Sequence, residues 1–561
     1  MPKFSAEEKA LLEPFVTDTE SDIYAVRGPT GLIGAVYARY SRAPGGFRET
    51  LLKEFVKGGN VDAKRAQELI ERVLVAYGDD SVGELEGTHV SFENISILAT
   101  KEIEDRRIGG SPIEQSTRYV FFDQRDADGR FRYFRDPLVM ASPHATAYVE
   151  TMDFIFQTYC DLIEPMKAYY GGLKPLDAAE YDINGDGVKE KYADLADEKD
   201  QKAFRITYTN DLRSKACDTL RYLLPIATKT NVGVFGNGRF FQNVLSHCLG
   251  HDLPEVQTIA VAAKAALDGI MPSYVKRAKA SSYLQGVRKD MRELTGRLLA
   301  GLGDITTKPV ELLDRGEDAI AAACAAKPGD ADALRAAMRH EEDSLTIACM
   351  LYPHADASLQ AIRSYVRRLS PEDRQAAINA YIGDRETRRD RPGRALESGY
   401  PYTFDCCTDF GTYKDLMRHR MGTQLRQKFT PMLGFSMPPD LAAAGYADRA
   451  LECMRRAQDL YLRLQPDFPD AASYATLHGS LTRWVLGMND RPLMHLVELR
   501  TQPAGHPSYR KLAQQMHRLV EDRSPWRGQA IAFVNHEDVF WSRAESEAKQ
   551  RVKEKALDEK K

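Results

Sequence analysis

Two arginine-rich motifs carry the side chains of this chain that are best suited to chemistry. The first, RRIGGSPIEQSTRY, begins at Arg106, and the second, RHRMGTQLRQKFTP, begins at Arg418. The triplet Arg418-His419-Arg420 places three cationic or proton-carrying groups together. Arginine forks bind phosphates bidentately, and a histidine can stack on a heterocycle or donate to it. In isolation such a triplet is more often a solvated basic face.

The loop that closes the first motif is equally rich in polar groups. A carboxylate, an amide, two hydroxyls and a guanidinium follow one another at Glu114, Gln115, Ser116, Thr117 and Arg118. These groups can together hold a phosphate and the edge of a base. Taken alone, the same five residues could form an ordinary polar turn.

The two motifs belong to an internal repeat. Both contain the frame Arg-x-x-x-Gly-Ser/Thr, and each is followed by an Asn-x-Arg segment, at Asn237 and Asn489, that we expect to open a helix. A threonine, Thr230 or Thr482, stands seven residues before each of these asparagines. Matches in the same order in both halves predict a tandem duplication.

Together these motifs resemble the flavin-dependent thymidylate synthase family, whose signature is RHRxxS followed, after four residues, by Ser-x-Arg. The family's later Asn-x-Arg, with a further arginine eleven residues after the asparagine, has its counterpart in Asn489, Arg491 and Arg500. The resemblance covers roughly residues 30–290 and 345–525. It implies a helix-rich α/β (α+β) fold made of two fused copies of the synthase domain.

The resemblance also implies a reaction, the reductive methylation of dUMP or a related pyrimidine nucleotide. FAD would be the cofactor, with NADPH and methylenetetrahydrofolate as co-substrates. Arg500 and Ser116 would be the catalytic residues, Arg500 by polarising the pyrimidine near its N3. His495 stands where the family has another flavin-contacting residue, an asparagine. The implied cofactor-binding residues are Arg418, His419, Arg420, Asn489, Arg491 and His495.

Neither half keeps the complete set. The N-terminal half retains Ser-x-Arg and Arg221, whereas the C-terminal half retains RHR and Arg500. We therefore expect one composite site per chain. Its nucleotide-binding residues would be Glu114, Gln115, Ser116, Thr117, Arg118, Arg221, Arg418 and Arg500. Two alternatives remain open, a non-catalytic flavin- or nucleotide-binding protein and a flavoenzyme redirected to another pyrimidine substrate.

Composition and charge narrow the partners. The 561 residues carry 77 basic and 81 acidic side chains, a formal net charge of −4, which argues against nucleic acid and against an anionic membrane surface as partners. The sequence has no secretory leader and no apolar stretch long enough to span a membrane. Its eight cysteines lack disulfide-framework spacing, so we expect a cytoplasmic protein. Because the family is tetrameric, two fused copies suggest a homodimer, a pseudo-tetramer of domains.

The elements that must position these residues fall into two predicted domains. The first spans 1–310 with a polar insertion at 171–200, a linker region follows at 311–344, the second domain spans 345–540, and 541–561 form a charged tail. Within the first domain, GLIGAVYARYS indicates a strand or a strand followed by a turn. The segment THVSFENIS indicates a strand that leads into a helix with Ile95, Ala99 and Ile103 at helical spacing.

Two further patterns suggest metal binding but are set aside. The segment DINGDG at 182–187 matches the start of a calcium loop, but the glutamate that should end that loop is missing. His247, His251 and Glu255 are spaced to align on one helical face, yet Pro254 interrupts that helix and no fourth ligand is visible. We read these three side chains as the wall of a polar pocket and predict no metal site.

Overall fold

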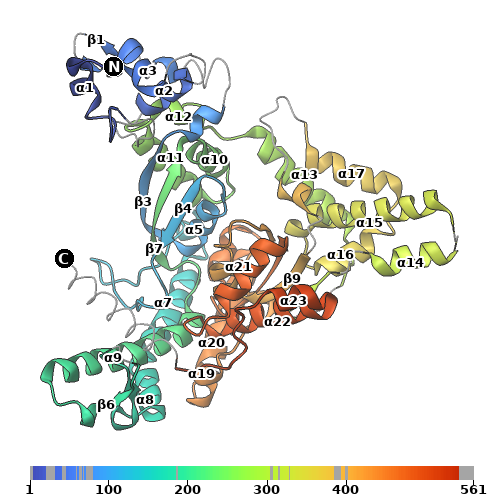
Figure 1. The fold of residues 1–561 in the computed structure, drawn as a ribbon. Coiled ribbons are helices and arrows are strands. Elements are labelled where there is room, and N and C mark those ends of the chain that lie inside the picture. The colour runs from blue at the N-terminus through green and yellow to red at the C-terminus, as the bar shows by residue number, and fades with distance from the viewer. Residues whose placement is uncertain are drawn as a thin grey trace. The chain divides into compact units, whose positions relative to one another are not determined.

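The chain forms two compact units (Figure 1). Unit 1 comprises Met1–Ile95, Ala99–Gln115 and Thr230–Gln285, and unit 2 comprises Ser96–Leu98, Ser116–Lys229 and Gly286–Lys561. The two units therefore divide the chain differently from the predicted domains, because residues 116–229 pack with the C-terminal half. The computed structural model describes residues 4–20, 32–40, 46–57, 60–61, 66, 68–70, 80–184, 187–303, 308–313, 316–326, 329–384, 393–398 and 402–541.

Unit 1 is built on a three-stranded sheet in the order β3-β7-β4. Strand β4 (Gly110–Glu114) pairs antiparallel with β7 (Lys229–Asn237), with Gly110 opposite Gly236. Helix α10 packs against α11, and both are seen beside the sheet in Figure 1. The other bounds are α1 Ala6–Leu12, α2 Leu32–Tyr40, α3 Phe47–Thr50, β1 Val56–Lys57, β2 Asn60–Val61, β3 Gly87–Ser96, α5 Ile97–Glu104, α10 Gly238–Leu249, α11 Pro254–Asp268 and α12 Pro272–Val275.

The local predictions in this unit have different outcomes. Strand β3 and helix α5 confirm the predicted strand-to-helix transition, and Ile95, Ala99 and Ile103 are all buried. The strand predicted in GLIGAVYARYS is wrong, because the described residues Leu32–Tyr40 form helix α2. The buried residues Leu32, Ala35 and Val36 follow the helical spacing i, i+3, i+4, which governs this segment.

Unit 2 contains a four-stranded sheet in the order β10-β11-β9-β8 with antiparallel pairing throughout. Antiparallel sheets combined with many helices make the fold α+β. The strands are β8 Val310–Leu312, β9 Tyr402–Asp409, β10 Thr423–Arg426 and β11 Leu481–Met488. The helices are α6 Pro137–Met140, α7 Ala145–Asp161, α8 Ile163–Leu173, α9 Glu198–Leu220, α13 Ser282–Leu298, α14 Glu317–Ala326, α15 Ala331–Leu351, α16 Leu359–Val366, α17 Pro371–Ile382, α18 Phe410–Leu416, α19 Pro439–Ala443, α20 Ala447–Leu464, α21 Asp490–Arg500, α22 Pro507–Arg523 and α23 Pro525–Ala530.

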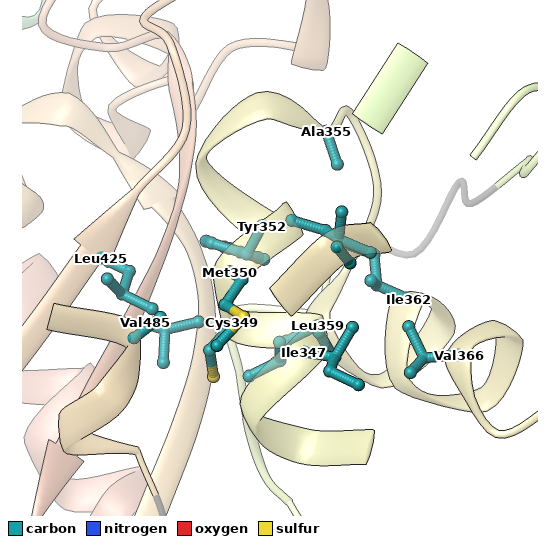
Figure 2. Close-up of a cluster of buried hydrophobic side chains, with 14 of the residues drawn as sticks. Ile347, Cys349, Met350, Tyr352, Ala355, Leu359, Ile362, Val366, Leu425 and Val485 are labelled. Atoms are coloured by element: carbon teal, nitrogen blue, oxygen red, sulfur yellow. The ribbon is translucent and has the colours of Figure 1, made fainter. Parts of the chain in front are cut away.

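The segment 311–344, predicted as a linker region, contributes folded elements to unit 2. Strand β8 extends the sheet, and helix α15 runs through the end of this segment. Leu313 of this segment is buried in a hydrophobic core with Met350 of α15 and Val485 of the sheet, two residues that lie side by side in Figure 2. The described part of this segment is therefore structural, because its apolar side chains find a core that its Ala- and charge-rich composition does not reveal.

The predicted insertion at 171–200 also folds. It forms the short hairpin β5 (Glu180–Tyr181) and β6 (Glu190–Lys191), and Tyr181 is buried in a small core of its own with Phe204 of α9. Gly185 and Asp186 of the calcium-like loop lie outside the described residues. In the described part, the Asp182 carboxylate accepts a hydrogen bond from the Gly187 amide at 3.1 Å.

The two halves share one sequence of elements. In the N-terminal copy β3–α5–β4 precedes β7–α10, and in the C-terminal copy β9–α18–β10 precedes β11–α21. The pairing registers agree, because Ser111 pairs with the residue two before Asn237, and the corresponding Thr423 pairs with the residue two before Asn489. Asn237 and Asn489 each cap the helix that follows, and this confirms the prediction that they open helices.

The copies meet in unit 2 through a symmetrical pair of hydrogen bonds. The Ile226 amide donates to the Thr476 carbonyl at 2.8 Å, and the His478 amide donates to the Leu224 carbonyl at 2.9 Å. In the frame set by the two Asn-x-Arg motifs, Ile226 corresponds to His478 and Leu224 to Thr476. Each copy therefore offers the same backbone groups to the other, as two subunits do across a two-fold axis.

A buried carboxyl in the unit 2 core predicts that stability depends on pH. Burial raises the pKa of Asp405 to about 7, although the Leu359 amide, which donates to it at 2.6 Å, opposes the shift. A carboxyl with a raised folded-state pKa binds more protons when folded, so the free energy of unfolding falls as pH rises from about 4 to 7. We expect Asp405→Asn to remove this fall and to be more stable than the wild type at pH 8.

Urea unfolding of both proteins at pH 5 and pH 8 measures this effect. Each pKa unit corresponds to about 1.4 kcal/mol, so the variant should gain a few kcal/mol relative to the wild type between the two pH values. Asp459→Asn, at an exposed carboxylate of α20, is the matched control and should gain nothing. An equal gain in both variants would contradict the assignment to Asp405.

Two general features complete the fold. Among the described residues, no helix combines the length and the apolar character needed to cross a membrane. No disulfide joins any of the eight cysteines, all of which are described.

Candidate functional site

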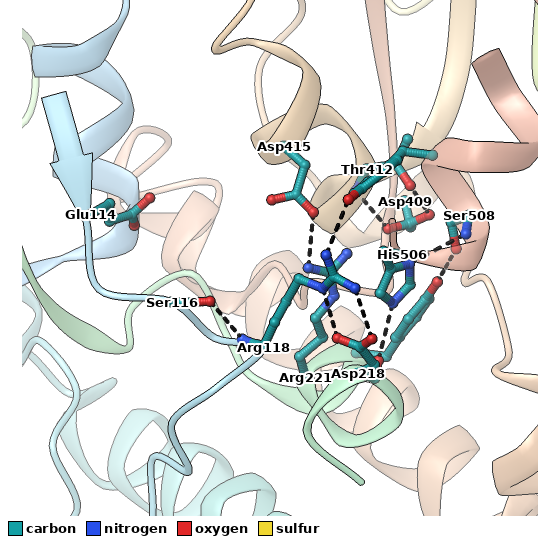
Figure 3. A network of polar contacts seen from close by, with 12 residues as sticks. Glu114, Ser116, Arg118, Asp218, Arg221, Asp409, Thr412, Asp415, His506 and Ser508 are labelled. Carbon is teal, nitrogen blue, oxygen red and sulfur yellow. Dashed lines mark hydrogen bonds and ion pairs between the residues drawn. The ribbon is translucent and has the colours of Figure 1, made fainter. Parts of the chain in front are cut away.

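The candidate site lies in unit 2, where segments of both sequence copies meet. Helix α9 ends at Leu220, which places Asp218 in its last turn and Arg221 directly after it. Helix α18 ends at Leu416 with Asp415 in its last turn. Figure 3 shows both carboxylates facing arginines of the N-terminal copy.

Arg118 is held by a bidentate ion pair. Its Nε and Nη2 donate to the two Asp218 carboxylate oxygens at 2.8 and 2.9 Å, and its backbone amide donates to the Ser116 hydroxyl at 3.2 Å (Figure 3). Burial acts to lower the pKa of Arg118, but Asp218 outweighs burial and raises it. The guanidinium is therefore a permanent cation with a fixed orientation.

Arg221 is a buried cation with unused donors. Its side chain is 1% exposed, and its Nη1 donates to an Asp415 carboxylate oxygen at 3.0 Å. Its Nε and Nη2 have no hydrogen-bond partner among the described residues. Gly411 lies against this fork, since a Cβ added there would be 2.9 Å from Nη2. A buried guanidinium with two open donors is suited to an anionic acceptor such as a phosphate.

Two carboxylates beside Arg221 have pKa values shifted in opposite directions. Burial acts to raise the pKa of Asp415, but Arg221, Arg118 and Arg418 outweigh it and hold this pKa far below its usual value. The pKa of Asp409 is raised by burial, although Arg221 and a hydrogen bond from the Thr412 hydroxyl oppose the shift. Asp415 is therefore an anion that shares the arginine cluster at neutral pH.

Tyr509 of α22 joins the arginines of the two copies. Arg118 Nη1 donates to the Tyr509 hydroxyl at 3.0 Å, and the Arg118 guanidinium carbon is 5.6 Å from the ring centroid. The Arg500 guanidinium carbon is 5.3 Å from the same centroid. The structure therefore brings Arg118 of the N-terminal copy and Arg500 of the C-terminal copy to one aromatic ring.

His419 orients Arg500. Arg500 Nε donates to His419 Nε2 at 2.7 Å, so this ring nitrogen must be unprotonated. Burial, together with the nearby Arg500 and His495, lowers the pKa of His419 to about 3. The imidazole is therefore neutral at physiological pH and holds Arg500 by accepting from Nε, and this leaves the rest of the guanidinium for other partners.

The predicted flavin-binding residues gather at one end of the β10–β11 ladder. That ladder ends at Thr423 opposite Gly487, next to the RHR turn and to Asn489. The Asn489 side chain accepts from the Arg491 amide at 3.2 Å, and the His419 and His495 ring centroids are 5.7 Å apart. Asn489, Arg491, His495 and Arg418 are exposed, and Arg420 is half-buried. Exposed cations beside the start of an 11-residue helix fit a cofactor diphosphate.

Two predicted residues belong to unit 1 and have structural partners there. Glu114 accepts from Lys101 Nζ at 3.0 Å and from the Thr100 hydroxyl at 3.3 Å, all within a buried cluster that also contains Glu104. Gln115 accepts from the Asn231 side chain at 3.4 Å. Glu114 neutralises the buried Lys101, and this ion pair holds strand β4 to helix α5.

The sequence did not single out several residues of this site. Asp218, Asp415 and Tyr509 were missed, and so was His506, whose ring accepts from the Ser508 amide at 3.2 Å. His506 caps α22, and burial lowers its pKa to about 3. A signal for the acids was available, because each stands three residues before an arginine of the predicted site, at one helical turn.

A cluster of buried and half-buried arginines beside exposed cations and a helix N-terminus is typical of proteins that bind phosphorylated ligands. The family described as thymidylate synthase complementing protein matches residues 33–273 and 334–526. The chain therefore belongs to this family of flavin-dependent thymidylate synthases, as a tandem-duplicated member.

The chain aligns with three relatives over nearly their full lengths. The chain is 34% identical over 558 residues to a UPF0159 protein of Chlamydia pneumoniae, with 97% of this chain and 98% of the relative covered. A UPF0159 protein of Chlamydia muridarum is 34% identical over 570 residues, covering 98% and 99%. A UPF0159 protein of Thermoplasma acidophilum is 28% identical over 525 residues, covering 93% and 98%.

Proposed function

We propose that this protein is an FAD-dependent enzyme that methylates dUMP, or a related pyrimidine nucleotide, at one composite site per chain. Methylenetetrahydrofolate and NADPH would be its co-substrates, in keeping with the thymidylate synthase family to which it belongs. The observation that carries the proposal is the meeting of Arg118 and Arg500, one from each copy, at the ring of Tyr509.

Different arginines contact different parts of the nucleotide in this proposal. Arg221 offers Nε and Nη2 to the phosphate, and the ion pair with Asp218 fixes Arg118 beside it. Arg500, oriented by neutral His419, polarises the pyrimidine near its N3 and stabilises the charge that develops on the ring. Ser116 supports this arrangement by accepting from the Arg118 amide.

FAD, when bound, supplies the hydride for the reduction, and the chain binds and orients it. Arg418, Arg420 and Arg491 provide cations for its diphosphate, and Asn489 caps the helix whose N-terminus faces the same end of the sheet. His495 is exposed beside His419, where its ring can contact the flavin.

Tritium release is the direct test of this reaction. The full-length protein, reconstituted with FAD, is incubated with 5-tritiated dUMP, methylenetetrahydrofolate and NADPH. We expect release of tritium to water that depends on both co-substrates. A flavin spectrum without tritium release from dUMP would contradict the methylation of this nucleotide.

One observation favours a second candidate, a flavoenzyme or binding protein with another pyrimidine ligand. Asp415 is an anion that already accepts a hydrogen bond from Arg221 Nη1. Its negative charge repels a phosphate dianion bound to the same guanidinium. Calorimetric titration with dUMP and with deoxyuridine separates the two candidates. Tighter binding of the uncharged nucleoside would support the second one.

Two fused synthase-like copies also suggest that the chain assembles as a homodimer. Such a dimer contains four copies, the number that the family uses. Analytical ultracentrifugation gives the mass in solution, and a monomer would contradict this part of the proposal.

A further inference from the structure

Unit 1 brings together three side chains that the proposed reaction does not use. Glu102 lies in α5, His247 lies in α10, and His251 follows one turn later, just after α10 ends at Leu249. One ligand atom from each of the three side chains lies within 4.8 Å of the other two. The carboxylate of this cluster is that of Glu102 in α5, whereas the sequence spacing suggested Glu255, which lies in α11.

The distances between these ligand atoms match those around a single bound ion. His247 Nε2 is 3.4 Å and His251 Nε2 is 3.3 Å from the same Glu102 oxygen, Oε2. Metal–ligand bonds of about 2.0–2.1 Å at tetrahedral angles place ligand atoms roughly 3.3–3.4 Å apart. Hydrogen bonds between nitrogen and oxygen are usually shorter, near 2.9 Å.

We propose that Glu102, His247 and His251 bind one transition-metal ion of the Zn²⁺ class, with a coordination position left for water or a small ligand. Two histidines and one carboxylate are the protein ligands of open zinc sites, whereas closed structural sites have four. Glu102 is buried and the histidines are half-buried, so an ion can enter from the side of the two rings.

The carboxylate of this cluster lies at the position in the N-terminal copy that corresponds to Asp415 in the C-terminal copy. The Ile97 amide donates to Thr228, and the Phe410 amide donates in the same way to Ser480, so helix α5 corresponds to α18. Glu102 stands five residues after Ile97, as Asp415 stands five residues after Phe410. The N-terminal copy therefore has a carboxylate at the same helical position, with different partners.

The second helix shows a complementary change. Arg500 stands eleven residues after Asn489, and the residue eleven after Asn237 is Cys248, with His247 directly before it. Arg500 of the C-terminal copy is thus replaced, in the N-terminal copy, by Cys248 with His247 beside it. Loss of the arginine removes anion recognition, and the histidine pair supplies metal ligands instead.

Two neighbouring groups affect how the ion would bind. The Leu253 amide donates to His251 Nδ1 at 3.1 Å, so Nδ1 carries no proton and a single ring proton would be on Nε2. Metal binding at Nε2 moves this proton to Nδ1 and ends the Leu253 contact. Arg106 carries a positive charge near His247, which opposes the binding of a cation there.

Metal titration of the full-length protein tests the proposal. The tag-free chain is stripped with chelator, dialysed and titrated with Co²⁺, followed by competition with Zn²⁺. We expect one equivalent of Co²⁺ with the visible absorption of a four- or five-coordinate site, displaced by Zn²⁺. Wild-type protein that takes up no stoichiometric Co²⁺ would overturn the proposal without any variant.

Variants then assign the ligands. His247→Ala, His251→Ala and Glu102→Gln should each weaken Co²⁺ binding more than about 100-fold, since even changes around the ligands cost 10–100-fold. His89→Ala, at an exposed histidine of the same unit, and Glu255→Gln should leave it unchanged. Circular dichroism checks that each variant is folded. Unchanged affinity in a folded His251→Ala variant would overturn the assignment.

Discussion

Arg118→Ala and Arg500→Ala, made separately, are each expected to weaken dUMP binding by about 100-fold. The two guanidiniums come from different sequence copies, yet both lie at the ring of Tyr509, so one nucleotide can contact both. Hydrogen bonds to a charged group contribute about 1.5–3 kcal/mol, and about 2.7 kcal/mol corresponds to a 100-fold change in affinity. Isothermal titration calorimetry with dUMP measures the change.

The control for this pair is Arg463→Ala, at an exposed arginine of α20, which should bind dUMP as the wild type does. A loss of affinity in only one of the two site variants would show that the site is not composite. If the wild type itself does not bind dUMP, the proposed substrate is wrong. That result does not contradict the contribution of both copies to one site. Thermal unfolding of both variants separates lost binding from lost folding.

Arg221→Met is expected to lower the free energy of unfolding by about 3–5 kcal/mol at pH 7. Removal of one partner of a buried ion pair leaves the other charge without compensation, and Arg221 and Asp415 form such a pair at 3.0 Å. The folded-state pKa of Asp415 is depressed in the wild type, so the pair contributes its stability above the unfolded pKa near 4. This contribution is lost as pH falls below about 4.

Urea unfolding at pH 7 and at pH 3 measures the effect of Arg221→Met, and the gap to the wild type should narrow at the lower pH. The double variant Arg221→Met/Asp415→Asn carries no isolated charge and should recover much of the lost stability. If the double variant is no more stable than the single one, the ion pair is not the cause. Gly411→Ala keeps both charges but crowds Nη2, so it should weaken dUMP binding without this pH dependence.

Much of the architecture could be predicted from short-range patterns. The strand that leads into α5, the asparagines that cap α10 and α21, and the duplication follow from spacing and helix-capping chemistry within a few residues. Short apolar runs are less informative, because Leu32–Tyr40 fits either a strand or a helix until its packing partners are known.

The partners of the site residues could not be predicted in this way. The sequence by itself determined the family, the repeat and which arginines survive in each copy, since these depend on residue identity and order. Only the tertiary structure placed Asp218 and Asp415 against the arginines and Tyr509 between Arg118 and Arg500. It also showed that the acid beside the two histidines is Glu102 and not Glu255. Each of these contacts joins segments far apart in the chain, and the packing of helices and strands, rather than any local spacing, decides which side chains meet.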